Sequence, residues 1–242
     1  MKNLNNNLLF ESAFKYASIG MALVALDGKW LKVNKSLCEL LQYSEKELLS
    51  KTFQDITHPE DLEIDLQNVQ NLLDKKSDDY AMEKRYFDRL GNIVWVILNV
   101  SVVRDENGDF QFFIAQIQDI TKRKKYFQEL LEEKKRIENI LEGTQAGTWE
   151  WNVKTGETRF NEYWANIIGY TLKEIEPISI NTWEKFTHPD DLALSYKNLE
   201  DYFAGKTDVY HAECRMKHKE GQWVWIMDRG KVVSRDREGK PE

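Results

Sequence analysis

Apolar and polar residues alternate along several short stretches in the first half of the chain. In residues 93–104, Val94, Val96 and Leu98 fall on one side and Trp95 on the other, and this period of two is typical of a β-strand. The pair Asp27-Gly28 ends an apolar run and is a common hairpin signal. We therefore predict strands over residues 20–26, 29–33, 80–87, 93–104 and 110–120.

Helical signals fill the region between the second and third predicted strands. Asn34 suits the N-cap of a short helix. Thr57 and Glu60 have the spacing of a capping box, with Pro59 between them, and they predict a longer helix over residues 59–74. Two strands, three helices and three strands, in that order, favour an antiparallel sheet with helices on one face.

The sequence repeats itself once. The segment Thr57–Leu62, THPEDL, returns as THPDDL at Thr187–Leu192, 130 residues later, and the same offset carries Trp95 onto Trp225. This period is too long for a solenoid repeat, so it indicates one domain duplicated in tandem. The predicted fold class is α+β, with two copies that are joined by a helix. Each copy is expected to be a five-stranded antiparallel sheet with helices on one face.

The second copy ends early relative to the first. Glu242 aligns near Phe112, so the equivalent of the last strand is expected to be missing and the chain to be a fragment of a longer protein. Because that strand should sit centrally in the sheet, its neighbour is expected to keep an unpaired edge. The expected parts are an N-terminal helix or cap (1–18), a first domain (19–121), a connecting helix (122–141) and a truncated second domain (142–242).

Length and charge narrow the class of protein. The 242 residues suit two domains of common size, and 34 basic residues against 41 acidic ones give a net charge of −7. The acidic balance argues against a nucleic-acid binder. No apolar run approaches the ~20 residues of a membrane span, no signal peptide is recognisable, and two cysteines are too few for a disulfide framework. We expect a cytoplasmic protein.

Several motifs occur in a fixed order, and the second copy has counterparts of all but the last. Asp27-Gly28, then His58-Pro59-Glu60-Asp61, then Gly91 four residues before Trp95, and finally Asp119-Ile120-Thr121 mark the first copy. Together they resemble the PAS sensory domain with its PAC extension. The resemblance implies a sensor or dimerisation module attached to an output domain, which would be a diguanylate cyclase or phosphodiesterase, or a histidine kinase.

Two residues depart from the PAS pattern. Gln42 stands where the family usually has Gly, and Leu90 stands where it has Asp before the Gly91 turn. Both positions often need a positive φ, which ordinary side chains rarely adopt. We therefore expect local strain or a changed turn at these two places.

The connecting segment has the character of a marginal coiled coil. Residues 121–141 are highly charged and contain neither Gly nor Pro, and about two heptads of apolar spacing run through them. The seam consists of Tyr126, Leu130, Ile137 and Ile140. We expect a homodimer through this seam, and the alternative is a single amphipathic connector packed on a domain. The proposed relay from the first domain to this helix is Asp119, Ile120 and Thr121.

The predicted domain cores leave room for an unknown small ligand, and no cofactor is predicted. The candidate pocket residues are Cys38, Phe53, Leu98, Ile117, Trp149, Trp164 and Trp183. Light-sensing PAS domains place a flavin-reactive Cys and a flavin-facing Gln where this chain has Phe53 and Ile117. Haem-binding relatives carry an axial His in the long helix, where this chain has Asp65 and Ser195. A ligand-free dimerisation scaffold is the alternative to a ligand sensor.

Six of the eight tryptophans lie in the second copy. They favour either a ligand cavity, including an aromatic cage for a cation, or a large core with further packing on the outer face. Trp223 and Trp225 share one face of a strand, as Trp95 does in the first copy, and we expect a helix or a partner subunit to cover it. The candidate covering helix contains Leu8, Leu9, Phe10 and Phe14.

The two His-Pro motifs are interpreted as helix starts. His58 and His188 each precede a proline and two acidic residues, which suit the positive end of a helix dipole. No nucleophile or Gly-rich loop accompanies either motif, so we predict neither acid–base catalysis nor a metal site.

Overall fold

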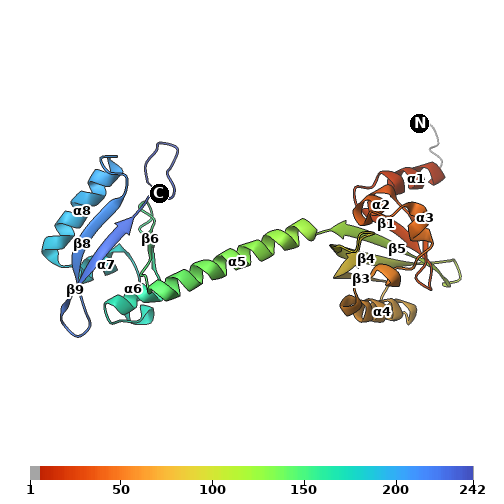
Figure 1. Ribbon diagram of the computed structural model, residues 1–242, viewed down its shortest axis with the longest axis horizontal. Coiled ribbons are helices and arrows are strands. Elements are labelled where there is room, and N and C mark those ends of the chain that lie inside the picture. Colours follow the sequence, from red (N-terminus) through yellow and green to blue (C-terminus); the bar gives the residue numbers. More distant parts are fainter. Residues whose placement is uncertain (1–5, 242) are drawn as a thin grey trace. The chain divides into compact units, whose positions relative to one another are not determined.

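The computed structural model describes residues 6–241 and divides into a first unit, Met1–Glu132, and a second unit, Glu133–Glu242. Each unit is described by itself (Figure 1). Helix α5 (Thr121–Thr144) contains the point of division. Residues 1–5 of the predicted N-terminal helix or cap, and Glu242 of the predicted second domain, lie outside the described part.

The first unit is a five-stranded antiparallel sheet with helices packed on it. The strands have the order β2-β1-β5-β4-β3, so the last strand lies at the centre. The elements are α1 (Asn6–Tyr16), β1 (Gly20–Val24), β2 (Trp30–Val33), α2 (Lys35–Leu41), α3 (Glu45–Leu49), η1 (Gln54–Ile56), α4 (Pro59–Leu73), β3 (Asp79–Phe87), β4 (Ile93–Arg104) and β5 (Phe110–Asp119). This arrangement confirms the predicted fold class.

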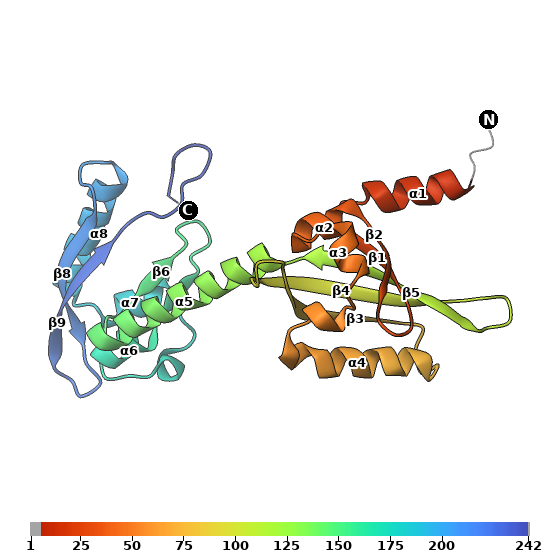
Figure 2. The same cartoon turned by 45° about the vertical axis from the view of Figure 1, so that its right-hand side comes forward.

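One apolar core holds the first unit together. The alternation predicted in β4 is observed, with Val94, Val96 and Leu98 buried on one side of the strand. These residues share a cluster with Leu37 of α2 and Leu72 of α4. The helices therefore cover the face of the sheet that the alternation predicts (Figure 2).

The second unit repeats the order of elements with fewer strands. Its elements are β6 (Trp149–Trp151), β7 (Thr158–Phe160), α6 (Glu162–Ile167), η2 (Leu172–Ile175), α7 (Ile180–Phe186), α8 (Pro189–Phe203), β8 (Tyr210–Lys217) and β9 (Trp223–Gly230). Its strands form two separate hairpins, β6-β7 and β8-β9. In the first unit β5 pairs with both β1 and β4. Because residues 231–241 form no equivalent strand, nothing joins the two hairpins into one sheet.

Side chains cap the N-termini of α2, α3, α4, α6 and α8. Asn34 accepts a hydrogen bond from the backbone N–H of Leu37 at 2.9 Å, as predicted. The predicted capping box of Thr57 and Glu60 is wrong, although the helix begins at Pro59 as predicted. His58 is the N-cap, and its Nδ1 accepts from the backbone N–H of Glu60 at 3.3 Å. Pro59 imposes this shift, since the residue before a proline is restricted to an extended backbone.

One of the two departures from the PAS pattern takes the expected left-handed backbone. Gln42 has a φ of 59°, and its side-chain amide donates to Asp88 at 2.8 Å. Gly169, at the matching place in the second unit, has a φ of 80°. Leu90 is not among the described residues with positive φ, and the turn uses Gly91 with a φ of 83° instead. The expected strain is therefore confined to Gln42.

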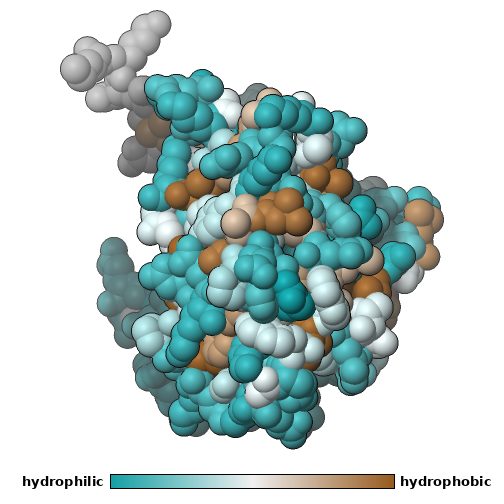
Figure 3. Space-filling model, turned by 90° about the vertical axis from the view of Figure 1, so that its left-hand side faces the viewer, coloured by the Kyte–Doolittle hydropathy of each residue, from teal (hydrophilic) through white to brown (hydrophobic). Residues whose placement is uncertain are grey.

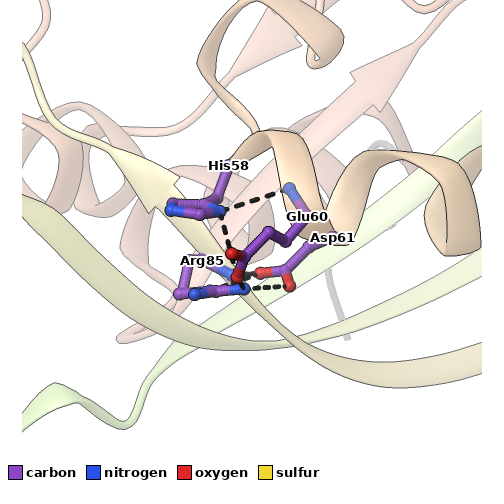
Figure 4. A network of polar contacts seen from close by, with 4 residues as sticks. All are labelled: His58, Glu60, Asp61 and Arg85. Carbon is purple, nitrogen blue, oxygen red and sulfur yellow. Dashed lines mark hydrogen bonds and ion pairs between the residues drawn. The ribbon is translucent and has the colours of Figure 1, made fainter.

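The acidic side chains of the His-Pro motif join α4 to β3 by hydrogen bonds and ion pairs. Asp61 accepts from the backbone N–H of Arg85 at 2.7 Å and from its guanidinium at 2.9 and 2.6 Å, while Glu60 accepts from the same guanidinium at 2.8 Å (Figure 4). The ring of His58 lies against Phe87, with centroids 5.3 Å apart. These contacts support the interpretation of the motif as a structural helix start.

The second unit repeats these hydrogen bonds between α8 and β8. Asp191 accepts from the backbone N–H of Arg215 at 2.8 Å and from its guanidinium at 2.7 Å twice. These bonds lower the pKa of Asp191 to about 2. The aspartate–arginine pair is thus present in both copies. We therefore interpret it as part of the fold and not as a functional site of one copy.

Replacing Asp61 by alanine should destabilise the first unit far more than replacing Glu60. Asp61 is mostly buried and Glu60 is exposed, so we expect about 2–3 kcal/mol for Asp61→Ala and less than about 1 kcal/mol for Glu60→Ala. Arg85 lowers the pKa of Asp61. Its stabilisation is therefore complete above the unfolded pKa of about 3.9 and is lost as the pH falls through the folded pKa. Urea unfolding at neutral and acid pH measures both effects, and equal losses from the two variants would contradict them.

Candidate ligand-binding cores and the start of helix α5

A small cavity lies beneath the sheet of the first unit. It measures about 20 Å³, which is enough for about one water molecule. Phe53 and Leu98 of the predicted pocket line it. Ile117 is fully buried in the surrounding core, and Cys38 packs half-buried at the edge of that core, but neither lines the cavity.

Asp65 lines this cavity and belongs to a buried ion pair that sequence reasoning missed. Lys84 Nζ donates to Asp65 Oδ2 at 2.5 Å, and both side chains are almost completely buried. The strand register and the helical spacing of the sequence could have indicated this pair. Lys84 lies on the inward-facing register of β3 with Tyr86, and Asp65 falls between the apolar positions Leu62 and Val69 of α4.

Aromatic rings and hydroxyl groups complete the surroundings of the Lys84 ammonium group. The Nζ atom lies 4.1 Å from the ring centroid of Tyr86 and 5.2 Å from that of Phe53. Thr57 Oγ1 accepts a further hydrogen bond from it at 3.0 Å, and the Tyr80 hydroxyl donates to Asp65 at 2.8 Å. Burial lowers the pKa of Lys84 to about 8 although Asp65 acts in the opposite direction, so the ammonium remains charged at neutral pH.

The second unit has no such pair at the matching positions. The offset of 130 residues carries Lys84 onto Cys214 and Asp65 onto Ser195, and both replacements are fully buried. A carboxylate appears instead at Asp228, the equivalent of Leu98. Asp228 accepts from Trp149 Nε1 at 2.7 Å and from the Tyr210 hydroxyl at 3.4 Å. Burial raises the pKa of Asp228.

Between its two hairpins the second unit has hollows at the place that β5 fills in the first unit. An inner cavity of about 30 Å³ lies at the place that matches the cavity of the first unit. Two hollows of about 380 and 420 Å³ adjoin it and are lined by residues of both hairpins, β6-β7 and β8-β9. Trp149 lines all three, and the structure places Trp164 and Trp183 with it around the inner cavity and the larger hollow. The Trp149 ring packs against Gly230 of β9. A Cβ atom at this position would lie only 2.5 Å from the ring, so the contact requires glycine.

The predicted relay residues join the sheet of the first unit to α5. Ile120 is buried, and its N–H donates to the carbonyl of Trp95 at 2.9 Å. Thr121 Oγ1 accepts from the N–H of Trp95 at 3.0 Å, and Asp119 accepts from the N–H of Thr121 at 2.8 Å. The end of β5 and the first residue of α5 are thus held on β4.

The first turn of α5 also covers part of the outer face of this sheet. Lys124 lies 4.7 Å from the ring centroid of Trp95 and pairs with Glu83 at 2.6 Å. The Arg85 guanidinium lies 5.2 Å from the same ring centroid. In the second unit Arg215 lies 5.4 Å from the ring centroid of Trp225, but Trp225 is 67% exposed. Apolar patches interrupt the hydrophilic surface in Figure 3.

The expectation that the N-terminal helix covers the Trp95 face is wrong. In Figures 1 and 2, α1 lies beside α2 and on the far side of the unit from α4. Asn34 Nδ2 donates to the carbonyl of Phe14 at 3.1 Å, and Lys32 pairs with Glu11 at 2.5 Å. These polar contacts direct the helix to β2 and α2. Of its apolar residues, Phe14 is buried, whereas Leu8, Leu9 and Phe10 are exposed.

The apolar seam of α5 is exposed along its length. Ion pairs between residues four apart, such as Lys125 with Glu129 and Lys134 with Glu138, lie on the helix surface. The helix has no buried residue. The exposed fractions of the seam residues are 66% for Tyr126, 66% for Leu130, 50% for Ile137 and 54% for Ile140.

A family model described as PAS fold matches residues 31–117 and again residues 157–242. This chain belongs to the PAS-fold family. None of the helices of this tandem PAS protein within residues 6–241 has the length and apolar character needed to cross a bilayer.

The tandem PAS chain is similar to parts of larger signalling proteins. It is 38% identical over 215 residues to "Probable diguanylate cyclase DgcE" of Escherichia coli (strain K12), covering 88% of this chain and 19% of that protein. It is 24% identical over 159 residues to a "Blue-light-activated histidine kinase" of Brucella anthropi, covering 61% of this chain and 32% of that protein. The chain thus spans less than a third of either relative. A solved PAS domain of a protein from Colwellia psychrerythraea aligns with a TM-score of 0.46 and 21% identity, over 49% of this chain and 99% of that one.

Breaking the buried ion pair of the first PAS domain should cost more stability than replacing it. Lys84→Met leaves the Asp65 carboxylate buried without its partner, and we expect a loss of about 3–5 kcal/mol. The double variant Lys84→Met/Asp65→Leu removes both charges and should recover most of that loss. Urea unfolding followed by circular dichroism measures the difference. A double variant as unstable as the single one would show that the pair contributes packing rather than charge compensation.

Proposed function

We propose that this chain is the sensory region of a signal-transduction protein whose output domain is a diguanylate cyclase. The observation that carries the proposal is the 38% identity with DgcE over 88% of the chain. A match over 88% of the chain includes parts of both PAS domains and the helix between them. A diguanylate cyclase uses GTP and a histidine kinase, the second candidate output, uses ATP, and both nucleotides are made inside the cell. We therefore place the chain in the cytoplasm.

A histidine kinase output is the second candidate. Two relatives named as histidine kinases match parts of the chain, at 24% identity over 159 residues and 23% over 115 residues. Their lower identity and shorter span make this output the less favoured one. The two candidates differ in the reaction to be measured, which is formation of cyclic di-GMP from GTP in one case and autophosphorylation from ATP in the other.

The signal is proposed to travel through β5 into α5. The strand lies between β1 and β4, so a change in the core acts on it from both sides. Ile120 and Thr121 hold the start of α5 to Trp95, and a small shift of this strand would therefore turn the helix. A pair of helices with two alternative packings would convert that turn into two states of the output.

The first PAS domain is proposed to act as a scaffold. The cavity of its core, at about 20 Å³, has no room for a flavin or a haem, and Asp65, which lines the cavity, is already paired with Lys84. One relative is named as blue-light-activated, and we do not extend that property to this domain.

A chimera tests the output. The region of DgcE that matches this chain is replaced by the matching residues of this chain, and cyclic di-GMP is measured in cells without other active cyclases. We expect the chimera to make cyclic di-GMP. We also expect Leu130→Glu/Ile137→Glu in the chimera to change the amount by about fivefold or more, the lower end of common allosteric coupling. A folded chimera without cyclase activity, or one indifferent to the seam variant, would contradict the proposal.

The same seam should hold a homodimer of this chain. Leu130→Glu/Ile137→Glu places charges in an apolar seam at a cost of a few kcal/mol for each buried group and should shift the chain to monomer. The control Gln128→Glu/Asn139→Glu adds the same charge on exposed positions outside the seam and should remain dimeric. Sedimentation at tens of micromolar measures both. A wild-type monomer at that concentration would refute the dimer.

A further inference from the structure

We propose that Lys134 fixes the orientation and register of two α5 helices in a homodimer, by contacting Glu133 of a second copy within the seam between them. The inference rests on the dimer in the proposed function, to which it adds the arrangement of the two helices. The partner is a second copy of this chain in parallel orientation.

The apolar side chains of α5 lie on one continuous face, which sets the phase of the heptad repeat. With Phe127 at position a, Leu130 and Ile137 take position d. Leu141 takes the next apolar a position. The positions b, c and f along this stretch are all polar or glycine: Gln128, Glu129, Glu132, Lys135, Arg136, Asn139, Glu142 and Gly143. The repeat therefore has one phase in which the apolar side chains face a single partner.

This phase changes two members of the seam expected from the sequence. Tyr126 and Ile140 take position g, at the edge of the contact. Phe127 and Leu141, each one residue further along the chain, take position a at its centre. Phe127 is 59% exposed on the single chain. The two arrangements share both d positions and differ by a rotation of each helix of about 100° about its axis.

A charged residue interrupts the apolar face at its middle. The a position between Leu130 and Ile137 is Lys134. Glu133 and Glu138 take the adjacent g and e positions. Lys134 lies 3.6 Å from Glu138 on its own helix, and both side chains are exposed. The seam thus has one cationic layer with apolar layers on both sides.

A parallel, in-register pair places a carboxylate of the second copy beside this lysine. An a side chain inserts into a hole formed by four residues of the facing helix, among them the residue at the preceding g position. Lys134 of each copy therefore meets Glu133 of the other and keeps Glu138 of its own helix. On the single chain Glu133 lies 3.9 Å from Arg136 in an exposed ion pair. Such a pair contributes little and does not hold Glu133 away from a partner.

Other arrangements of the two helices leave the lysine against apolar side chains. In an antiparallel pair a positions face d positions, which are Leu130 and Ile137 on either side of Lys134. In a parallel pair shifted by one heptad, Lys134 faces Phe127 or Leu141. An ammonium group that is withdrawn from water without a carboxylate partner is unfavourable. The single charged a residue therefore selects the parallel, in-register pair.

Charge variants of the whole 242-residue chain test the contact. Lys134→Glu places a glutamate in the seam beside Glu133 of the second copy and should raise the dissociation constant of the dimer by about tenfold or more. The control Lys135→Glu makes the same change of charge at the next residue, which takes position b outside the seam. It should leave the constant within about threefold of wild type. Sedimentation over a concentration series measures both, and equal constants for the two variants would overturn the proposal.

Reversing the pair tests whether the two residues meet. Lys134→Glu/Glu133→Lys again places unlike charges opposite each other across the seam. The dissociation constant should return to within about threefold of wild type. A double variant that dimerises as weakly as Lys134→Glu would overturn the contact.

Cysteine cross-linking tests the orientation and the phase of the seam. In a parallel, in-register pair, equivalent a residues face each other within reach of a disulfide, whereas equivalent g residues lie on opposite sides. On mild oxidation Phe127→Cys should form a disulfide-linked dimer, and Tyr126→Cys should do so at least about tenfold more slowly. The wild-type chain, with Cys38 and Cys214, gives the background. Faster cross-linking of Tyr126→Cys, or of neither variant in a dimeric chain, would contradict the proposed seam.

These outcomes are separable from those of the proposed function. A dimer that is broken by Leu130→Glu/Ile137→Glu and unaffected by Lys134→Glu would keep the homodimer and overturn the role of Lys134. The DgcE chimera measures cyclic di-GMP, so its activity tests the output domain and not the register of α5. A wild-type monomer would overturn both the homodimer and this inference.

Discussion

A charge buried in a protein core must be neutralised where it lies, and the two PAS domains meet this constraint differently. In the first, Lys84 and Asp65 neutralise each other beneath the sheet, and the remaining cavity holds about one water molecule. In the second, the pair is replaced by Cys214 and Ser195, and a carboxylate at Asp228 has only neutral partners in the described residues. One duplicated fold thus buries charge in two ways, as an ion pair in the first domain and as a carboxylate with neutral hydrogen-bond donors in the second.

The central strand is the second constraint on this molecule. In the first domain β5 pairs on both sides, closes the core and continues into α5 through Ile120 and Thr121. The same strand therefore carries both stability and the proposed signal. In the second domain the two hairpins lack this link within the described residues, and Trp149 spans from β6 to β9 to contact Asp228.

Most of the fold could be predicted from the sequence because it depends on local patterns. Alternation gave the strands, and the repeated THP motif gave the duplication and the helix starts. The buried pair could not be found in this way, since Lys84 and Asp65 are 19 residues apart and only tertiary contact makes their charges compatible with burial. The placement of α1 likewise depends on Asn34 and Lys32, two polar residues of distant elements. The capping shift to His58 could have been predicted from Pro59 alone.

Hydrogen–deuterium exchange of the chain and of its Lys84→Met variant tests most directly whether the buried ion pair holds the first core together. The account predicts faster exchange in β3 and α4, which carry Lys84 and Asp65, and unchanged exchange in β8 and α8 of the second domain. Unchanged exchange throughout the chain, or faster exchange confined to the second domain, would contradict it.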